Sequence, residues 1–250
     1  MVTSFGPETL WSATSVAFRY FDLGATLLWA ASGARIAARR GFDLVGIFVV
    51  ALVSSCGGGL LRDALFLQAG PPAVVRTPAY ITIVAATTLV TWRFGSHLNK
   101  AVPPTFPRFA MQFADALGLG AFAVVGMRLA LAASIHPAGA AMVGVVNAVG
   151  GQLVRSLLLR QTPKIFQPGE YTASAAAVGT VVYGLLFVVA HVDERLAAVA
   201  TILCVAALRW ASVHYQLRTR PAYRRRRSRS LRPKAALADQ PFSRGTPPAK

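Results

Sequence analysis

Seven stretches of about twenty mostly apolar residues constrain the fold of this chain more than any other feature. A helix needs roughly 20 such residues to cross about 30 Å of hydrocarbon. The stretches cover residues 17–38, 43–67, 79–94, 109–133, 138–159, 171–190 and 196–217. A hydrophobic content of 54% with 14% charged residues is typical of a membrane protein rather than a soluble enzyme. The sequence therefore predicts an all-α membrane protein with seven transmembrane helices.

The basic residues are unevenly distributed and predict the orientation of the chain. Residues 218–250 hold eleven of the 26 basic residues, one acid and five prolines, which is typical of a disordered basic tail. Every second loop between the apolar stretches is basic. The basic loops hold Arg39 and Arg40, Lys100 and Arg108, and Arg160 and Lys164. Basic loops stay in the cytoplasm, so we expect a multi-pass protein of the cell membrane with segment 1–16 outside and the tail inside. The tail is expected to contact anionic lipid headgroups rather than nucleic acid.

The first three and the next three apolar stretches are related by an internal repeat with an offset of 93 residues. The repeat pairs Asp22 with Asp115, Gly33 with Gly126, Arg35 with Arg128, Gly57 and Gly58 with Gly150 and Gly151, and Arg62 with Arg155. Each unit has three spans, an odd number, so the second unit must enter the bilayer in the opposite sense. The predicted organisation is a first repeat over 17–98, a proline-rich cytoplasmic linker over 99–108, a second inverted repeat over 109–192, and a seventh helix over 193–217.

Glycines occupy the middle of the second and fifth apolar stretches, at Gly57–Gly59 and Gly150–Gly151. Each glycine disfavours a helix by ~1 kcal/mol. We expect helices 2 and 5 to be broken there, which would free backbone carbonyls to bind a desolvated cation. The alternative interpretation is that the glycines only allow two helices to pack closely.

Charged residues follow the first glycine motif directly. Arg62 and Asp63 are adjacent and do not face each other on a regular helix, so each needs another partner. We predict a network between the repeats, in which Asp63 faces Arg155 and Arg62 meets a carbonyl or an acid such as Asp115. Asp22 and Asp115 either draw cations towards the path or cap helix ends, and Tyr80 is expected to anchor its helix at the interface. The predicted ion path comprises Asp22, Gly57, Gly58, Gly59, Arg62, Asp63, Asp115, Gly150, Gly151 and Arg155.

Motifs for catalysis are absent from the sequence. No Ser-His-Asp order, metal-ligand spacing, phosphate loop or dinucleotide fingerprint is present. We therefore expect no enzyme activity, no catalytic residue, no metal site and no cofactor. Cys56 and Cys204 both lie in apolar runs, so no disulfide is expected.

These features resemble the trimeric intracellular cation channel family, including bacterial members described as glycine transporter domain proteins. The resemblance covers about residues 21–190 and the seventh helix. It rests on the segments Asp22–Ala25, Arg39–Asp43, Gly57–Asp63, Asp115–Gly118, Gly150–Gly151 with Arg155, and Glu170–Tyr171. The resemblance implies a seven-helix protomer, a homotrimer, lipids in protomer crevices, and a potassium-permeable path lined by the kinked second and fifth helices. The second repeat departs from the family pattern at Gln152, in place of the third glycine, and at Ser156, in place of the aspartate.

We therefore expect a channel for monovalent cations, with potassium as the expected ion. A secondary transporter of a small solute such as glycine is the alternative, because inverted repeats and broken helices also serve transporters. A non-conducting membrane scaffold whose basic tail binds partners is the third interpretation.

Overall fold

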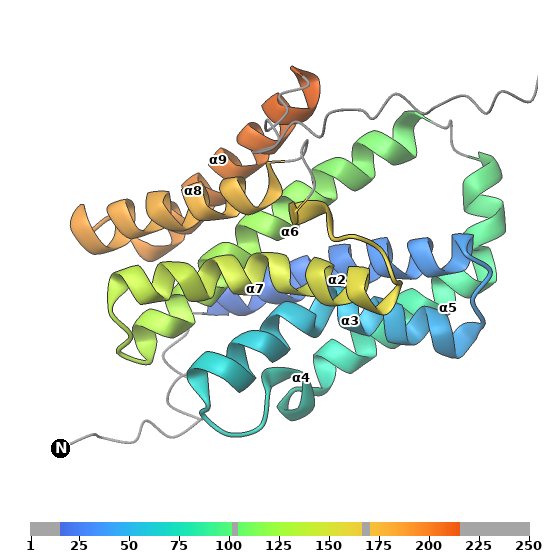
Figure 1. Ribbon diagram of the computed structural model, residues 1–250, viewed down its shortest axis with the longest axis horizontal. Helices are drawn as coiled ribbons and strands as arrows, with labels where there is room; N and C mark the ends of the chain where they lie inside the picture. Colours follow the sequence, from blue (N-terminus) through green and yellow to red (C-terminus); the bar gives the residue numbers. More distant parts are fainter. Residues whose placement is uncertain (1–15, 102–104, 167–170, 216–250) are drawn as a thin grey trace, which may run out of the picture. The chain divides into compact units, whose positions relative to one another are not determined.

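The computed structural model describes residues 16–101, 105–166 and 171–215, and in these residues every regular element is a helix (Figure 1). The α-helices are α2 (Val16–Arg39), α3 (Leu44–Arg62), α4 (Ala73–Arg76), α5 (Pro78–Ala101), α6 (Thr105–Ala132), α7 (Pro137–Leu158), α8 (Thr172–Gly184) and α9 (Glu194–His214). Two π-helical turns, Asp63–Leu67 and Leu185–Val189, extend α3 and α8, and a 3-10 turn covers Lys164–Phe166. Residues 1–15 of the predicted N-terminal segment 1–16 and the basic tail 218–250 lie outside the described residues.

Five of the helical stretches are long and apolar enough to cross a membrane. They are Leu44–Leu67, Gln112–Ala132, Pro137–Leu158, Thr172–Val189 and Glu194–Ser212. The other two long helices, α2 and α5, each span 24 residues but carry more polar side chains. The described part of the chain is therefore all-helical, with the apolar helices of a membrane protein, and each predicted apolar stretch contains one helix.

Helices extend into the predicted linker 99–108. Helix α5 continues to Ala101 and α6 begins at Thr105, while residues 102–104 lie outside the described part. Pro107 lies in the first turn of α6, where its missing amide would have no intrahelical partner in any case. Prolines in the first turn are compatible with a helix, so fewer residues separate α5 from α6 than the prediction of a linker over 99–108 implies.

The long helices form two groups of three, as the repeat predicts. Helices α2, α3 and α5 pack on one another, and α6, α7 and α8 do the same (Figure 1). The groups meet where α3 lies against α7 and α2 lies against α6, while α9 packs on α6 and α8. Trp29 of α2 packs edge-on against Phe122 of α6, with ring centroids 5.0 Å apart.

Both glycine motifs lie inside continuous helices, so the predicted breaks are wrong. Helix α3 stays α-helical through Gly57–Gly59, and α7 does so through Gly150–Gly151. The first departure from α-helical geometry in α3 is the π-helical turn that begins at Asp63. Helical hydrogen bonding therefore continues at the glycines, and the motif does not provide freed carbonyls for an ion.

The glycines instead bring the backbones of α3 and α7 into direct contact. A methyl group at Gly57 would lie 3.2 Å from the Gly151 Cα, and one at Gly150 would lie 3.0 Å from the Gly58 Cα. These two contacts are equivalent under the repeat offset, as expected for two halves related by a two-fold axis. The residue numbers rise along α3 as they fall along α7, so the helices cross antiparallel.

Ser54 and Asn147 extend this reciprocity and are themselves equivalent under the repeat offset. A methyl group at Gly58 would overlap the Asn147 carbonyl oxygen, and one at Gly151 would overlap the Ser54 carbonyl oxygen. Close helix packing, the alternative interpretation of the glycines, is what the structure shows. The packing gained at this contact offsets the low helix propensity of glycine.

This crossing predicts opposite effects for two neighbouring glycines of the same motif. A methyl group at Gly59 would meet only the Arg62 Nη2, at 3.7 Å, whereas one at Gly58 would overlap backbone. We expect Gly58→Ala to destabilise the protein by about 1–3 kcal/mol through overpacking. Gly59→Ala should be neutral or stabilising by up to ~1 kcal/mol through its higher helix propensity.

Thermal unfolding of the detergent-purified variants measures the difference. Gly59→Ala is the matched control, because it makes the same chemical change one residue away. Equal midpoints for the two variants would show that the crossing tolerates a side chain and would contradict the close packing.

Candidate functional site

Two clusters of charged and polar side chains flank the glycine crossing. Arg62 lies four residues beyond Gly58 on α3, and Arg155 lies four residues beyond Gly151 on α7. Because the helices cross antiparallel, these arginines lie on opposite sides of the crossing. At a rise of 1.5 Å per residue they are separated by roughly 12 Å along the helices.

The first group of side chains, named here the Arg62 cluster, comprises Asp22, Arg62, Asp63 and Tyr80, all of which are buried. Arg62 is 2% exposed, and its Nε donates to the Asp63 Oδ1 at 2.8 Å. Its Nη2 lies 2.8 Å from the same oxygen. The other carboxylate oxygen, Oδ2, accepts from the Ala73 amide at the start of α4, at 2.9 Å. Both charges of this ion pair are therefore hydrogen-bonded, as buried charges require.

Asp22 of α2 is the second acid of this cluster. The Tyr80 hydroxyl of α5 donates a hydrogen bond to the Asp22 carboxylate. Arg62 lies within electrostatic range of Asp22. Tyr80 is therefore a buried partner of Asp22, and the prediction that it anchors α5 at the membrane interface is wrong.

Asn147 connects the Arg62 cluster to the second repeat. The Arg62 Nη1 donates to the Asn147 Oδ1 at 3.4 Å, and the Asn147 Nδ2 donates to the Phe122 carbonyl at 2.6 Å. The Asn147 side chain is 1% exposed. A single amide thus links α3, α6 and α7 beside the glycine crossing.

The second group of side chains, named here the Arg209 cluster, comprises Asp115, Gln152, Arg155, Thr172 and Arg209. The Gln152 Nε2 donates to the Asp115 Oδ1 at 2.9 Å. The Arg209 Nη2 lies 3.4 Å from the Asp115 Oδ2, and its Nη1 donates to the Thr172 Oγ1 at 3.0 Å. Arg155 is within electrostatic range of Asp115. This cluster therefore draws on α6, α7, α8 and α9.

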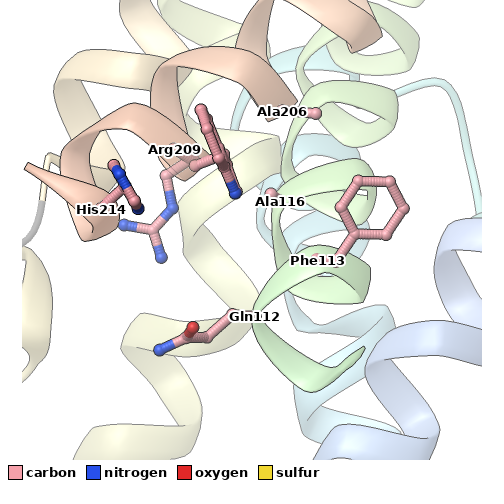
Figure 2. Close-up of a pocket in the computed structure, with 7 residues that line it drawn as sticks. Gln112, Phe113, Ala116, Ala206, Arg209 and His214 are labelled. Carbon is pink, nitrogen blue, oxygen red and sulfur yellow. The ribbon is translucent and has the colours of Figure 1, made fainter. Parts of the chain in front are cut away.

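A cavity of about 160 Å³ opens beside the Arg209 cluster, between α6 and α9 (Figure 2). It is lined by Gln112, Phe113, Ala116, Ala206, Arg209, Trp210 and His214. Figure 2 shows the Arg209 side chain reaching from α9 over the cavity, with Gln112 of α6 across from it. The Trp210 and His214 rings stack with their centroids 5.0 Å apart.

The predicted network between the repeats exists, but with different partners. Asp63 binds Arg62 and the Ala73 amide, so the predicted pairing of Asp63 with Arg155 is wrong. Arg62 reaches the second repeat through Asn147. Both residues have α-helical backbone angles, and they pair because the long Arg62 side chain brings its guanidinium to the carboxylate of the next residue.

Sequence reasoning missed Asn147 and Arg209. Asn147 was detectable as a buried amide in an apolar stretch, at the repeat position of Ser54. Arg209 lies in the seventh helix, outside both repeats, so a comparison of the two repeats cannot identify it. The sequence marks Gln152 only as a departure from the glycine pattern, whereas in the structure its side chain donates a hydrogen bond to Asp115.

Within residues 16–101, 105–166 and 171–215, no three His, Cys, Asp or Glu side chains gather as metal ligands would. Cys56 and Cys204 are free thiols. The chemistry that the two clusters offer is electrostatic, through carboxylates, guanidinium groups and amides.

Comparison with known proteins places the chain among bacterial membrane proteins. The sequence profile of a family described as "Glycine transporter" matches residues 19–96 and 112–188, the two repeats. A "UPF0126 membrane protein" of Deinococcus radiodurans is 32% identical over 77% of this chain and 86% of its own length. The "UPF0126 inner membrane protein YadS" of Escherichia coli K12 is 27% identical over 80% of this chain and 93% of its own length.

Solved structures with the same fold are cation channels. One, described under "Structural basis for conductance through TRIC cation channels", has a TM-score of 0.72 and 28% identity, covering 84% of this chain and 98% of the other. The TRIC trimeric intracellular cation channel orthologue from Rhodobacter sphaeroides has a TM-score of 0.72 and 27% identity, covering 81% of this chain and all of the other. A further channel structure, 16% identical with a TM-score of 0.57, shares the fold. The chain belongs to the trimeric intracellular cation channel family, in the bacterial branch that carries the glycine transporter description.

Proposed function

We propose that the protein is a channel for monovalent cations, with potassium as the principal ion. The observation that carries this proposal is the pair of charged clusters on opposite sides of the α3–α7 crossing. Ionisable residues inside a membrane are costly, and they mark ion or substrate paths by default. The likeness to TRIC cation channels at 27–28% identity supports the same function.

The proposed path runs from the Arg62 cluster, past the glycine crossing, to the Arg209 cluster. Asp22 and Asp63 supply negative charge at one end, where a cation would lose part of its hydration. The crossing is the narrowest part of this route, because Gly57 and Gly58 lie in backbone contact with Gly150 and Gly151. Conduction then requires α3 and α7 to move apart or to turn against each other, and glycines oppose such sliding least because they carry no side chains.

We further propose the assembly and orientation of the protein. Helices α2 and α5 span the membrane with the five more apolar stretches, giving seven spans in two inverted repeats and a seventh helix. The N-terminus lies outside and the C-terminus in the cytoplasm, because the basic loops then face inward. Three copies form a homotrimer with one path in each protomer, and membrane lipids occupy the crevices between helices. Intramembrane charges serve ion passage rather than catalysis.

Recordings from purified protein in planar bilayers test the function directly. We expect currents under a potassium chloride gradient to reverse close to the potassium equilibrium potential, since the acids at the path entrance favour cations. Currents that reverse at the chloride potential would contradict cation selectivity. Saturable, gradient-coupled uptake of glycine without current would indicate the transporter instead, and neither current nor uptake would indicate a scaffold.

The role of Asp22 is tested by Asp22→Asn, which removes the charge but keeps an oxygen that can accept from the Tyr80 hydroxyl. We expect this substitution to weaken the attraction for a cation by about 1 kcal/mol, which lowers the conductance at low potassium by roughly fivefold. Single-channel conductance measures the effect, and it should shrink as the salt concentration rises.

Asp193→Asn is the matched control. Asp193 is an exposed acid that accepts from the Arg195 and Leu196 amides at the start of α9, and asparagine can do the same. Conductance that falls equally in both variants would show that Asp22 acts only through general surface charge.

A further inference from the structure

We propose that residues 68–77, named here the α4 strap, close one end of the ion path, and that this end opens when Asp63 releases the Ala73 amide. The inference rests on the proposed channel function and deepens it, because it concerns how that function is regulated. The strap carries the short helix α4 and connects α3 with its π-helical turn to α5 (Figure 1). It also joins two members of the Arg62 cluster, since Asp63 begins the turn before it and Tyr80 lies in the first turn of α5 after it.

Asp63 holds the strap at two points. Its backbone carbonyl accepts from the Gln68 amide at 2.9 Å, and its side-chain Oδ2 accepts from the Ala73 amide at 2.9 Å. The other carboxylate oxygen, Oδ1, accepts from the Arg62 Nε. Both oxygens of this carboxylate are therefore occupied, and a cation can bind Oδ2 only after the Ala73 amide has moved away.

Arg76 fixes the internal shape of the strap. Its Nε donates to the Pro71 carbonyl at 2.6 Å, and its Nη2 donates to the Ala69 carbonyl at 2.6 Å. One guanidinium thus holds the first half of the strap against α4 and keeps the Ala73 amide within reach of Asp63. Arg76 is a positioning residue, because it acts on the path only through that amide.

The strap covers the Arg62 cluster but is itself held by few buried groups. Ala73 is 7% exposed, and the other side chains of the strap are partly or fully exposed. Arg62 and Asp63 are 2% and 7% exposed, so the end of the path is closed in this structure. Segments with few buried contacts open locally at a small free-energy cost while the rest of the fold stays intact. The strap has the properties of such a segment.

The strap is connected to the second acid of the cluster as well. The Tyr80 amide donates to the Thr77 carbonyl, the last residue of the strap, at 3.3 Å. The Tyr80 hydroxyl donates to the Asp22 carboxylate. A movement of the strap therefore changes the surroundings of Asp22 together with those of Asp63.

The equivalent position of the second repeat makes a different contact. Ser156 stands where the first repeat has Asp63, and its Oγ donates to the Gln152 carbonyl of its own helix at 2.7 Å. The connection that follows α7 contains the 3-10 turn Lys164–Phe166, whereas the strap contains α4. The contact between a carboxylate and the strap thus belongs to the first-repeat end of the path.

Cys56 provides a probe of this end that does not depend on ion flow. The thiol is buried on α3, within electrostatic range of Asp22 and Tyr80, so it lies beside the Arg62 cluster. Cys204→Ala leaves it as the single thiol of the chain. The experiment measures how fast a membrane-impermeant methanethiosulfonate modifies Cys56 in vesicles, with the reagent added to one side at a time. Single-channel recordings of the same variants measure the open probability.

Two substitutions release the strap by different routes. Arg76→Ala removes the guanidinium, and Ala73→Pro removes the amide that Asp63 accepts. Pro72, with φ -56° and ψ 152°, already has the conformation that a residue before proline requires, and position 73 is the first of α4, where proline is favoured. Because a hydrogen bond to a charged group is lost, we expect each variant to raise the modification rate and the open probability by about tenfold. The faster modification should occur from the strap side alone.

Arg76→Lys should restore slow modification, because the ammonium can still donate to the strap carbonyls. Arg195→Ala is the matched control, since it removes an exposed arginine of α9 and should leave the rate unchanged. If Ala73→Pro does not fold, Arg76→Ala and its lysine rescue decide the outcome.

Unchanged modification in Arg76→Ala would overturn the inference and, with currents intact, leave the channel function standing. An equal rise from both sides of the membrane, or an equal rise in Arg195→Ala, would overturn it too, because either result indicates general loosening of the fold. Faster modification from the strap side without current in any variant would instead support closure by the strap and overturn the channel function.

Discussion

The backbone contact between α3 and α7 is the constraint on which the rest of the structure depends. Helices in lipid gain no hydrophobic energy by burying apolar side chains against one another, so their association relies on close van der Waals packing and interhelical hydrogen bonds. Gly57, Gly58, Gly150 and Gly151 supply the close packing, and Asn147 supplies the hydrogen bond to Arg62. Because the contact is reciprocal and antiparallel, it fixes the two arginines of the repeats on opposite sides of one crossing.

The cost of buried charge explains the local structure around that crossing. An isolated ion in a membrane interior costs several kcal/mol, and pairing offsets this only when the remaining hydrogen-bonding positions are also filled. Arg62 meets this condition with Asp63 and Asn147, and Asp63 meets it with Arg62 and the Ala73 amide. The π-helical turn at Asp63 and the short helix α4 are therefore parts of one ion-pair site.

The sequence predicts the long helices because apolar length is a one-dimensional signal, and the repeat offset singles out Asp22, Arg62, Asp115 and Arg155, which lie in the two clusters. Whether the glycines break or pack their helices was not predictable from propensity, since both outcomes need small residues. The deciding fact is three-dimensional: Gly57 faces Gly151 and Gly150 faces Gly58 across the crossing. Arg209 was unpredictable for a related reason, because α9 has no repeat partner with which to compare it.

The two repeats share a backbone arrangement but differ in the side chains that contact their equivalent charged residues. A methyl group at Gly59 would meet only the Arg62 Nη2, whereas the equivalent residue of the second repeat is Gln152, whose side chain donates to Asp115. The contacts of the two equivalent aspartates show this difference: Asp22 accepts from the Tyr80 hydroxyl, whereas Asp115 accepts from the Gln152 amide and lies against the Arg209 guanidinium. Arg209 comes from α9, outside both repeats, so the seventh helix makes the surroundings of two equivalent carboxylates unequal.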